Sequence, residues 1–228
     1  NFSKKYISLV TSSITSETMI KEFYGNFDGH NNKINVQITE SVSNDIGTGL
    51  FSVNRGGIIE NLVVEGRVDG VVNIAGIAGI NDGTIRNCVN YASIVNNGSR
   101  AGGITAYSRQ GSSVINCDNH GAISGGSVNN DGSTDTNKMR GVGGVVGTIH
   151  NNSTNAVNIK IENCNNFGTV HNDYQAVGGI AGLILSNGHK IALTGELTIK
   201  NCTNSGEISS GKSFVGGIIG VMNNVNIV

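Results

Sequence analysis

Two short phrases alternate along the chain, and their spacing restricts the fold more than any other feature of the sequence. One phrase sets glycines among small and apolar residues, as in VGGIAG from Val177. The other is an apolar residue, any residue, Asn and then Leu or Cys, as in IENC from Ile161. Self-similarity at a fixed period is typical of chains that stack one small unit on the next.

The equivalent glycines set a base period of 27 residues. Gly49, Gly76 and Gly103 lie 27 residues apart, and the later intervals, to Gly144, Gly179 and Gly217, are 41, 35 and 38 residues. The additional residues fall into three segments, which are 125–140, 148–160 and 184–198. Because loops on a rigid frame commonly carry binding, these segments are predicted contact sites.

Each 27-residue unit contains three short apolar runs, which in the second unit are residues 74–80, 84–88 and 93–95. Each run has the length of a strand, and none shows a 3.6-residue period. Units stacked about 4.8 Å apart would pair each strand with its copies and bury a shared core. The sequence therefore predicts an all-β fold: a parallel β-helix (β-solenoid) of three strands per coil and about six to seven coils, right-handed like most parallel crossovers.

We expect one elongated domain. Residues 1–24 are predicted to supply an N-terminal strand that leads into the array, and residues 25–228 to form the array itself, as a fragment of a longer protein. The recurring apolar positions should face the core, and they are Ile85, Val114, Ile161, Ile199, Val68, Ile94, Ile123, Val170 and Ile208. A neighbouring column should face solvent, with opposite charges for Glu60 beside Arg86 and for Glu162 beside Lys200.

The glycine phrase resembles the GLUG motif, named for a Gly-Leu-(variable)-Gly core. Here the core reads GIAG from Gly76 and recurs at residues 144–147, 179–182 and 217–220, whereas GITA from Gly103 lacks the last glycine. A companion run of that family, Gly-x-Ile-x-Asn and an apolar residue, is similar to residues 83–88. The segment GNFDGHNNKI from Gly25 is similar to one that often precedes such arrays.

This resemblance covers residues 25–228. Such repeats occur in bacterial surface proteins, in adhesin-like proteins and in non-catalytic regions of IgA-cleaving metallopeptidases. The resemblance therefore implies an extracellular module, secreted or on the cell surface, and it carries over no catalytic residue.

One register position accepts either Leu or Cys, and its members are Leu62, Cys88, Cys117, Cys164 and Cys202. A free cysteine packs as a small hydrophobic residue, so we predict a buried column. A disulfide is the first alternative, although parallel Cβ vectors would strain it. Zinc is the second, although a line of thiols does not provide tetrahedral ligands.

Two columns of asparagine flank this position. The first, Asn61, Asn87, Asn116, Asn163 and Asn201, lies where a strand ends, and Asn tolerates left-handed backbone better than other non-glycine residues. The second, Asn90, Asn119, Asn166 and Asn204, could form an internal amide ladder. The glycines that follow two residues later, Gly66, Gly121, Gly168 and Gly206, are predicted to make tight bends.

Tyr91, His120 and Phe167 share one register position, with Ser205 following them. They form either a stacked patch that binds sugar or an ordinary surface covering. Asp131 and Asp135 could bind calcium, but their spacing departs from the EF-hand pattern, and a polar loop is the alternative. No other cofactor or metal is predicted, and no HExxH metallopeptidase motif is present.

Charge and composition limit the partners. The net charge of −1 gives no reason to expect nucleic acid, and no apolar run is long enough for membrane insertion. We predict a monomeric, non-catalytic module of a larger surface or secreted protein, which binds a host protein or glycan or serves as a stalk. The alternatives are an accessory domain of an IgA-type metallopeptidase and a β-helical polysaccharide lyase or hydrolase, which would need charged residues gathered on adjacent coils.

Overall fold

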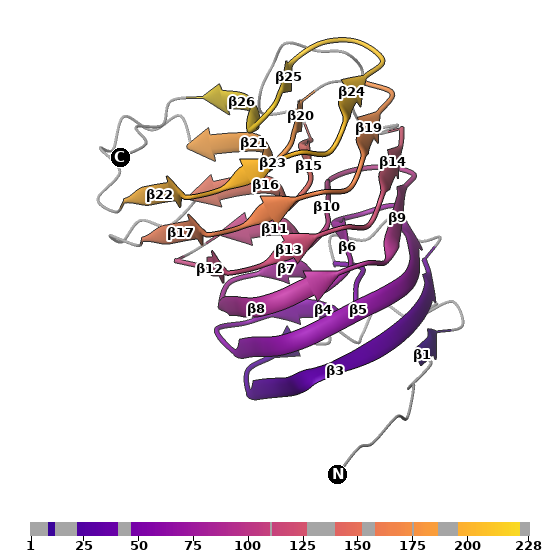
Figure 1. Cartoon of the computed structure of the whole chain (residues 1–228), viewed down its shortest axis with the longest axis vertical. Helices are drawn as coiled ribbons and strands as arrows, with labels where there is room; N and C mark the ends of the chain where they lie inside the picture. Colours follow the sequence, from indigo (N-terminus) through magenta and orange to yellow (C-terminus); the bar gives the residue numbers. More distant parts are fainter. Residues whose placement is uncertain are drawn as a thin grey trace.

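The structure is a computed structural model that describes residues 9–11, 22–40, 47–109, 111–126, 140–151, 158–174, 176–186 and 196–223; for 9–11, 151 and 186 it describes the backbone only. These residues form 26 strands in three sheets and contain no helix. Pairings between neighbouring strands are parallel throughout the described part. Figure 1 shows the strands stacked along the longest axis in sequence order. The prediction of an all-β chain with parallel strands is confirmed.

The largest sheet has 14 strands and carries the asparagine-cysteine phrases. It contains β1 (Leu9–Thr11), β3 (Asn26–Thr39), β5 (Ile58–Gly70), β8 (Thr84–Asn90), β9 (Ser93–Asn96), β12 (Ser113–Ile115), β13 (Asp118–Asn119), β14 (Ile123–Gly125), β17 (Ile159–Glu162), β18 (Asn165–Asn166), β19 (Val170–Asn172), β22 (Leu197–Lys200), β23 (Thr203–Asn204) and β24 (Ile208–Ser210).

The two smaller sheets carry the glycine phrases. The five-stranded sheet contains β6 (Ile74–Ala75), β10 (Ala101–Gly102), β15 (Val142–Gly143), β20 (Val177–Gly178) and β25 (Val215–Gly216). The seven-stranded sheet contains β2 (Glu22–Phe23), β4 (Phe51–Asn54), β7 (Ala78–Asn81), β11 (Thr105–Arg109), β16 (Val146–Asn151), β21 (Ala181–Ser186) and β26 (Ile219–Asn223).

Strand register follows the sequence repeat. Ile74 pairs with Ala101 across one 27-residue unit, and Val142 pairs with Val177 across a longer one. Val114 pairs with Ile161 although segment 125–140 lies between them. Much of the three insertions lies outside the described residues, but the register continues on both sides of each of them.

The prediction of three strands per unit is wrong. The apolar run 74–80 is divided at Gly76 and Ile77 into β6 and β7, which belong to different sheets. In later units the second run is divided as well, into pairs such as β12 and β13. The second division falls at asparagines with left-handed backbone, such as Asn116 with φ of 52°.

The division at Gly76 explains why the two phrases occur together. A Cβ on Gly76 would lie 2.1 Å from the Asn90 side-chain oxygen, and one on Gly103 would lie 2.3 Å from that of Asn119. Gly144 stands in the same relation to Asn166. Each of these glycines therefore leaves the space that an asparagine of the other phrase occupies, so a larger residue at the glycine would displace that asparagine.

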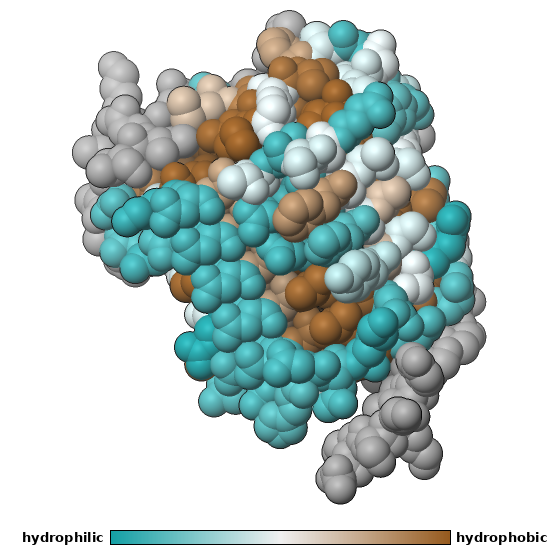
Figure 2. All heavy atoms as spheres, in the orientation of Figure 1, coloured by the Kyte–Doolittle hydropathy of each residue, from teal (hydrophilic) through white to brown (hydrophobic). Residues whose placement is uncertain are grey.

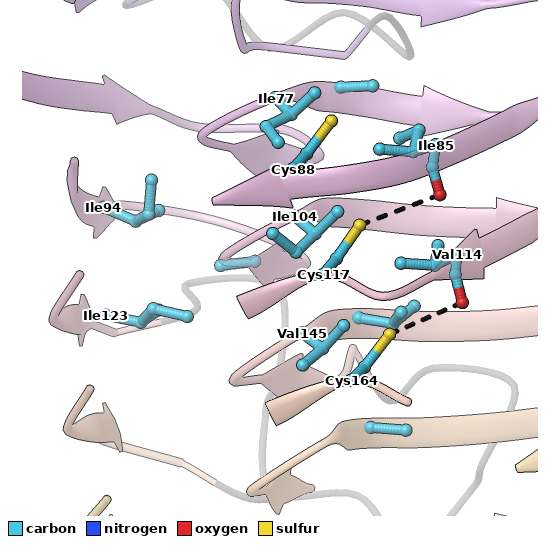
Figure 3. Close-up of a cluster of buried hydrophobic side chains, with 14 of the residues drawn as sticks. Ile77, Ile85, Cys88, Ile94, Ile104, Val114, Cys117, Ile123, Val145 and Cys164 are labelled. Atoms are coloured by element: carbon cyan, nitrogen blue, oxygen red, sulfur yellow. Dashed lines mark hydrogen bonds between the residues drawn. The ribbon is translucent and has the colours of Figure 1, made fainter. Parts of the chain in front are cut away.

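The core is a set of columns along the stack. Ile85, Val114 and Ile161 form one column with exposures of 0%, while Ile199 is only partly buried. A second column is Val68, Ile94, Ile123 and Val170, all at most 1% exposed, with Ile208 partly buried. Figure 3 shows Ile85 above Val114 and Ile94 above Ile123, in rows parallel to that of Ile77, Ile104 and Val145. The core prediction is confirmed, with looser burial at β22 and β24 on the C-terminal side.

The buried asparagines form a continuous ladder, as predicted. Asn90 donates from Nδ2 to Asn119 Oδ1, Asn119 donates to Asn166, and Asn166 donates to Asn204, each at 2.8 Å. Each of these amides also donates to the carbonyl two residues later, as Asn119 does to Gly121 O at 3.0 Å. Asn90, Asn119 and Asn166 are 0% exposed, and each is hydrogen-bonded, as buried polar groups usually are. We call these four residues the inner ladder.

The glycines two residues after the inner ladder serve mainly for close approach. Gly66 alone among Gly66, Gly121, Gly168 and Gly206 has a positive φ, of 107°. A Cβ on Gly121 would lie 2.0 Å from Ala92 O, and one on Gly168 would lie 2.2 Å from Gly121 O. The predicted bend residues are therefore required by contact between neighbouring units rather than by backbone conformation.

Candidate functional site: an exposed face of side-chain ladders

The aromatic column predicted from the sequence is a stack of rings. The centroids of Tyr91 and His120 lie 4.7 Å apart with planes 18° apart, and those of His120 and Phe167 lie 4.6 Å apart with planes 16° apart. Tyr91 is 50% exposed, Phe167 is 46% exposed and His120 is also exposed. The ring spacing matches the spacing of neighbouring strands because each ring extends from the same register position. We call these residues the aromatic stack.

Stacking limits what the rings can bind. Both faces of the His120 imidazole are covered, one by Tyr91 and the other by Phe167. The stack therefore presents ring edges to solvent along its length, and only the outer faces of Tyr91 and Phe167 can accept another flat group. A ligand that must lie on a ring face can bind at the ends of the stack but not at its middle.

A second ladder lies beside the rings, two residues earlier in each unit, and in it Asp118 and Asn165 are partly buried while Thr203 is exposed. Asn165 donates from Nδ2 to Asp118 Oδ1 at 2.8 Å, and Thr203 Oγ1 donates to Asn165 Oδ1 at 2.6 Å. These residues belong to β13, β18 and β23. Figure 1 shows β8, β13 and β23 one above another on the face turned towards the viewer.

A third exposed ladder consists of Asn61, Asn87, Asn116, Asn163 and Asn201, which we call the outer ladder. All five have φ between 52° and 53°, as predicted. Each of the four later members donates to its predecessor, as Asn116 does to Asn87 at 3.1 Å and Asn163 does to Asn116 at 2.9 Å, while Asn61 donates to Asp28 Oδ1 at 3.0 Å. The sequence predicted the backbone conformation of these residues but not this amide chain.

The predicted solvent-facing column lies beside the outer ladder. Arg86 Nε is 2.7 Å from Glu60 Oε2, with side-chain exposures of 44% and 21%. Glu162 and Lys200 are paired in register on β17 and β22. Together with the three ladders, this column makes a regular face, which we call the ladder face. Figure 2 shows polar side chains beside apolar ones on this side of the molecule.

The residues of the Leu/Cys position lie behind this face. Leu62, Cys88, Cys117 and Cys164 are 0% exposed, Cys202 is partly buried, and all four cysteines are free thiols. Figure 3 shows Cys88, Cys117 and Cys164 in one row, with Sγ of Cys117 3.8 Å from Ile85 O. Burial, together with contact with the adjacent thiols, raises the pKa of Cys117. The thiol is therefore an inert packing group, since the thiolate is the reactive form.

Among the described residues, no three His, Cys, Asp or Glu side chains lie close enough together to hold a metal ion. The histidines are dispersed: His30 is 2.9 Å from Asp28, and His171 is 3.1 Å from Asp173. The proposed calcium ligands Asp131 and Asp135 lie outside the described residues. In the same part of the chain, no helix could span a membrane.

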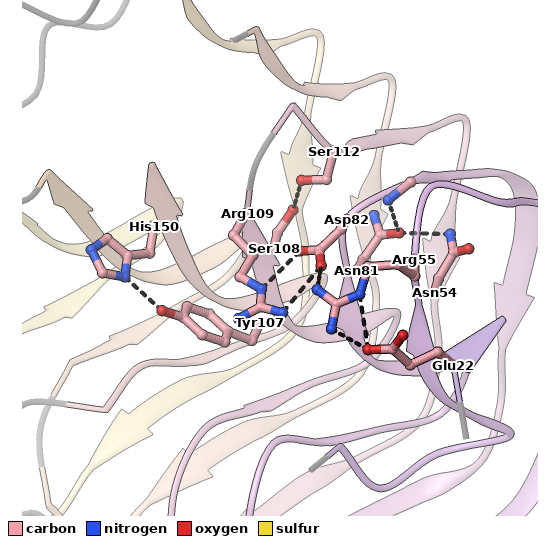
Figure 4. A network of polar contacts seen from close by, with 11 residues as sticks. Glu22, Asn54, Arg55, Asn81, Asp82, Tyr107, Ser108, Arg109, Ser112 and His150 are labelled. Carbon is pink, nitrogen blue, oxygen red and sulfur yellow. Dashed lines mark hydrogen bonds and ion pairs between the residues drawn. The ribbon is translucent and has the colours of Figure 1, made fainter. Parts of the chain in front are cut away.

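A cluster that the sequence analysis missed lies at the end of the seven-stranded sheet. Arg55 is paired with Glu22 (Nε–Oε1 3.0 Å) and with Asp82, and Arg109 is paired with Asp82 (Nε–Oδ1 2.8 Å). The Asp82 side chain is only 4% exposed. Figure 4 shows this row of side chains, together with Tyr107, whose hydroxyl lies 2.5 Å from His150 Nδ1. We call Glu22, Arg55, Asp82 and Arg109 the ion network.

The electrostatics of the ion network favour a structural role over a role in acid catalysis. Hydrogen bonds from Tyr24 and Arg55 lower the pKa of Glu22, which is opposite to the raised pKa that a carboxyl group needs to act as a general acid near neutral pH. Asp82 accepts from two guanidinium groups, which compensate its burial. The network thus links four successive strands of the seven-stranded sheet, β2, β4, β7 and β11, through alternating charges.

Comparisons with known proteins give a fold relationship. No protein-family model matches the chain, and no curated protein matches it significantly, so the GLUG resemblance stays a prediction. Among solved structures, the chain is similar to that of a candidate immunoglobulin A1 protease from Bacteroides ovatus, with a TM-score of 0.55 and 21% identity. The match covers 86% of this chain and 62% of that one. At this identity the likeness shows the fold alone.

Proposed function

We propose that this chain is a non-catalytic binding module of a secreted or cell-surface bacterial protein, built as a right-handed parallel β-helix of about six to seven coils. Parallel register between successive sequence units supports the β-helix. The GLUG resemblance supports an extracellular setting, and the Bacteroides ovatus neighbour has a similar fold. In this proposal the module is monomeric and belongs to a larger protein, in which it could serve as an accessory domain of an IgA-type peptidase.

The observation that carries the proposal is the exposed aromatic stack. Surface aromatic rings are favoured where a ligand is bound, because they supply apolar area with little loss of conformational entropy. Here two rings are about half exposed, and polar ladders flank them on a rigid frame. That combination suits a glycan or a glycosylated host protein, which presents both apolar ring faces and hydroxyl groups.

An enzymatic function has less support. In the described part of the chain, the gathered charges that a polysaccharide lyase or hydrolase would need are represented by the ion network. There the carboxylates are paired with arginine, and the pKa of Glu22 is lowered. We therefore assign the network to stabilising contacts between units.

Binding to immobilised oligosaccharides and mucin-type glycoproteins tests the proposal. The wild-type chain is expected to bind at least one class of glycan, and Phe167→Ala is expected to weaken that binding by roughly tenfold or more. Tyr24→Ala is the matched control, because Tyr24 is 67% exposed but lies outside the ladder face. Absence of binding across the panel, or equal loss in the two variants, would contradict the proposed function.

A further inference from the structure

The aromatic stack ends at a position where a ring could fit but a serine is present. Ser205 follows Asn204 as Phe167 follows Asn166, and Asn166 and Asn204 are paired in register. Ser205 N donates to Asn166 O at 2.9 Å, so Ser205 lies one strand spacing beyond Phe167. Its side chain is exposed and too short to cover the Phe167 ring. We call the space beside Ser205, over the outer face of Phe167, the ring slot.

The spacing of the stack gives the dimensions of the ring slot. Successive rings lie 4.7 and 4.6 Å apart, so a flat group at the level of Ser205 would continue the series. Phe167 is 46% exposed although His120 covers one of its faces. The exposed area therefore includes the face that borders the ring slot.

The opposite end of the stack borders an ion pair. Glu65 stands at the position before Tyr91, and its carboxylate lies 3.0 Å from Lys33 Nζ and 3.5 Å from Asn35 Nδ2. A ring at that end would have to displace an ion pair. The ring slot at Ser205 needs no such displacement.

The border of the ring slot is polar. Thr203 lies two residues before Ser205 and its hydroxyl donates to Asn165, and exposed Glu207 lies two residues after Ser205. A pyranose has apolar C–H groups on its faces and hydroxyl groups at its edge, which suits an aromatic face with polar neighbours. An aromatic side chain of a partner protein would instead leave Ser205 and Glu207 desolvated without hydrogen bonds, which is unfavourable.

We infer that the ring slot is a subsite for one pyranose ring of a glycan, stacked on Phe167 and hydrogen-bonded at its edge by Ser205 and Glu207. This inference rests on the proposed glycan-binding function. It assigns binding to one end of the aromatic stack, whereas Tyr91 and His120 act by holding Phe167 in place.

Substitutions at Ser205 test the inference directly. Ser205→Phe should fill the slot with a fourth ring, keep or raise the melting temperature, and abolish sugar binding. Ser205→Ala is the matched control, because it keeps the slot open and removes one hydroxyl, and it should retain binding within a few-fold. The probes are methyl β-D-galactopyranoside, methyl β-D-glucopyranoside and methyl α-D-mannopyranoside, titrated to roughly 50 mM because a single sugar ring is expected to bind in the millimolar range.

Backbone and aromatic NMR shifts provide the measurement. We expect saturable shifts at Phe167, Thr203, Ser205 and Glu207 with at least one probe, and their loss in Ser205→Phe. Shifts that persist in Ser205→Phe, or none with any probe, would overturn the subsite. If the wild-type chain binds immobilised glycans and Ser205→Phe binds them equally, the proposed function stands and the subsite is wrong. Loss of binding at Phe167→Ala together with a shift pattern centred on Tyr91 would also overturn it.

Discussion

The inner and outer ladders are built from the same amide at the same spacing, but one is buried and the other lies in solvent. Asn119 in the inner ladder is 0% exposed, whereas Asn116 in the outer ladder is exposed. Only Cys117 and Asp118 separate them in sequence. The comparison isolates the effect of environment, because an amide that loses its partner in solvent can bond to water, whereas a buried one cannot.

The largest effect is expected where the inner ladder meets its glycine. In Gly144→Ala the new Cβ would lie 2.2 Å from Gly179 O and 2.3 Å from Asn166 Cγ. We expect a loss of about 4 kcal/mol or more in the free energy of unfolding, measured by urea denaturation. Gly217→Ala is the control, because nothing lies within 4 Å of its Cβ position. Similar losses in both variants would show that the contact with Asn166 is unimportant.

The next largest effect is expected for Asn119→Ala. This change removes the acceptor of Asn90 and the donor to Asn166 and to Gly121 O. Since those groups are buried, we expect a loss of about 3 kcal/mol. A cost no larger than that of Asn116→Ala would mean that burial does not distinguish the two ladders.

Cysteine labelling distinguishes the fully buried part of the stack from the part that solvent reaches. Cys117 is fully buried, whereas Cys202 is only partly buried. Burial and contact with neighbouring thiols raise the pKa of Cys117, and contact with Cys164 and burial raise the pKa of Cys202, so access to the reagent sets the difference between them. In native protein we expect a maleimide to modify Cys202 on the order of 30-fold faster than Cys117. Mass spectrometry of digested samples gives both rates, with denatured protein as the control. Equal, rapid labelling of all four thiols would refute the buried column.

A smaller effect is expected in the outer ladder. Asn116 has φ of 52°, so Asn116→Ala should cost about 1 kcal/mol through backbone strain. Asn116→Gly should change the stability by less than about 0.5 kcal/mol, because glycine accepts this conformation and water replaces the amide contacts. If Asn116→Gly is as destabilising as Asn119→Ala, the outer amide chain contributes more than its exposure suggests.

The smallest effect is expected for the exposed ion pair on the same face. Glu60→Gln removes its attraction for Arg86, whose pKa is raised by their hydrogen bond. Exposed pairs contribute little because solvent screens them, so the loss of stability is expected to be smaller than that of Asn116→Ala. The difference between the variant and wild type should disappear at high salt. A difference that is insensitive to salt would point to packing instead.

Much of this arrangement could be predicted from the sequence because residue types recur at fixed offsets. Parallel register, the core columns, the inner ladder and the left-handed asparagines all follow from repetition of a single phrase. The division of run 74–80 at Gly76 could not be predicted, since it depends on Asn90 from the other phrase. A contact between two different phrases cannot be predicted from the repetition of either phrase alone.

The ion network was not predicted from the sequence, for a different reason. Arg55, Asp82, Arg109 and His150 all lie six residues after an equivalent glycine. Their register is therefore as regular as that of the cysteines, but the residue type changes at every step. The charge alternates at a constant offset from the equivalent glycine, and this pattern could have predicted the network. A search for identical residues does not detect it.

The two amide ladders also differ in direction. In the inner ladder every Nδ2 points towards the following unit, whereas in the outer ladder every Nδ2 points towards the preceding one. Their amide dipoles thus run antiparallel along the stack and oppose each other. The macrodipole of an α-helix builds up as the helix lengthens. The two opposed amide ladders add no comparable dipole when units are added. The ladders therefore allow the array to lengthen without electrostatic polarisation of its ends.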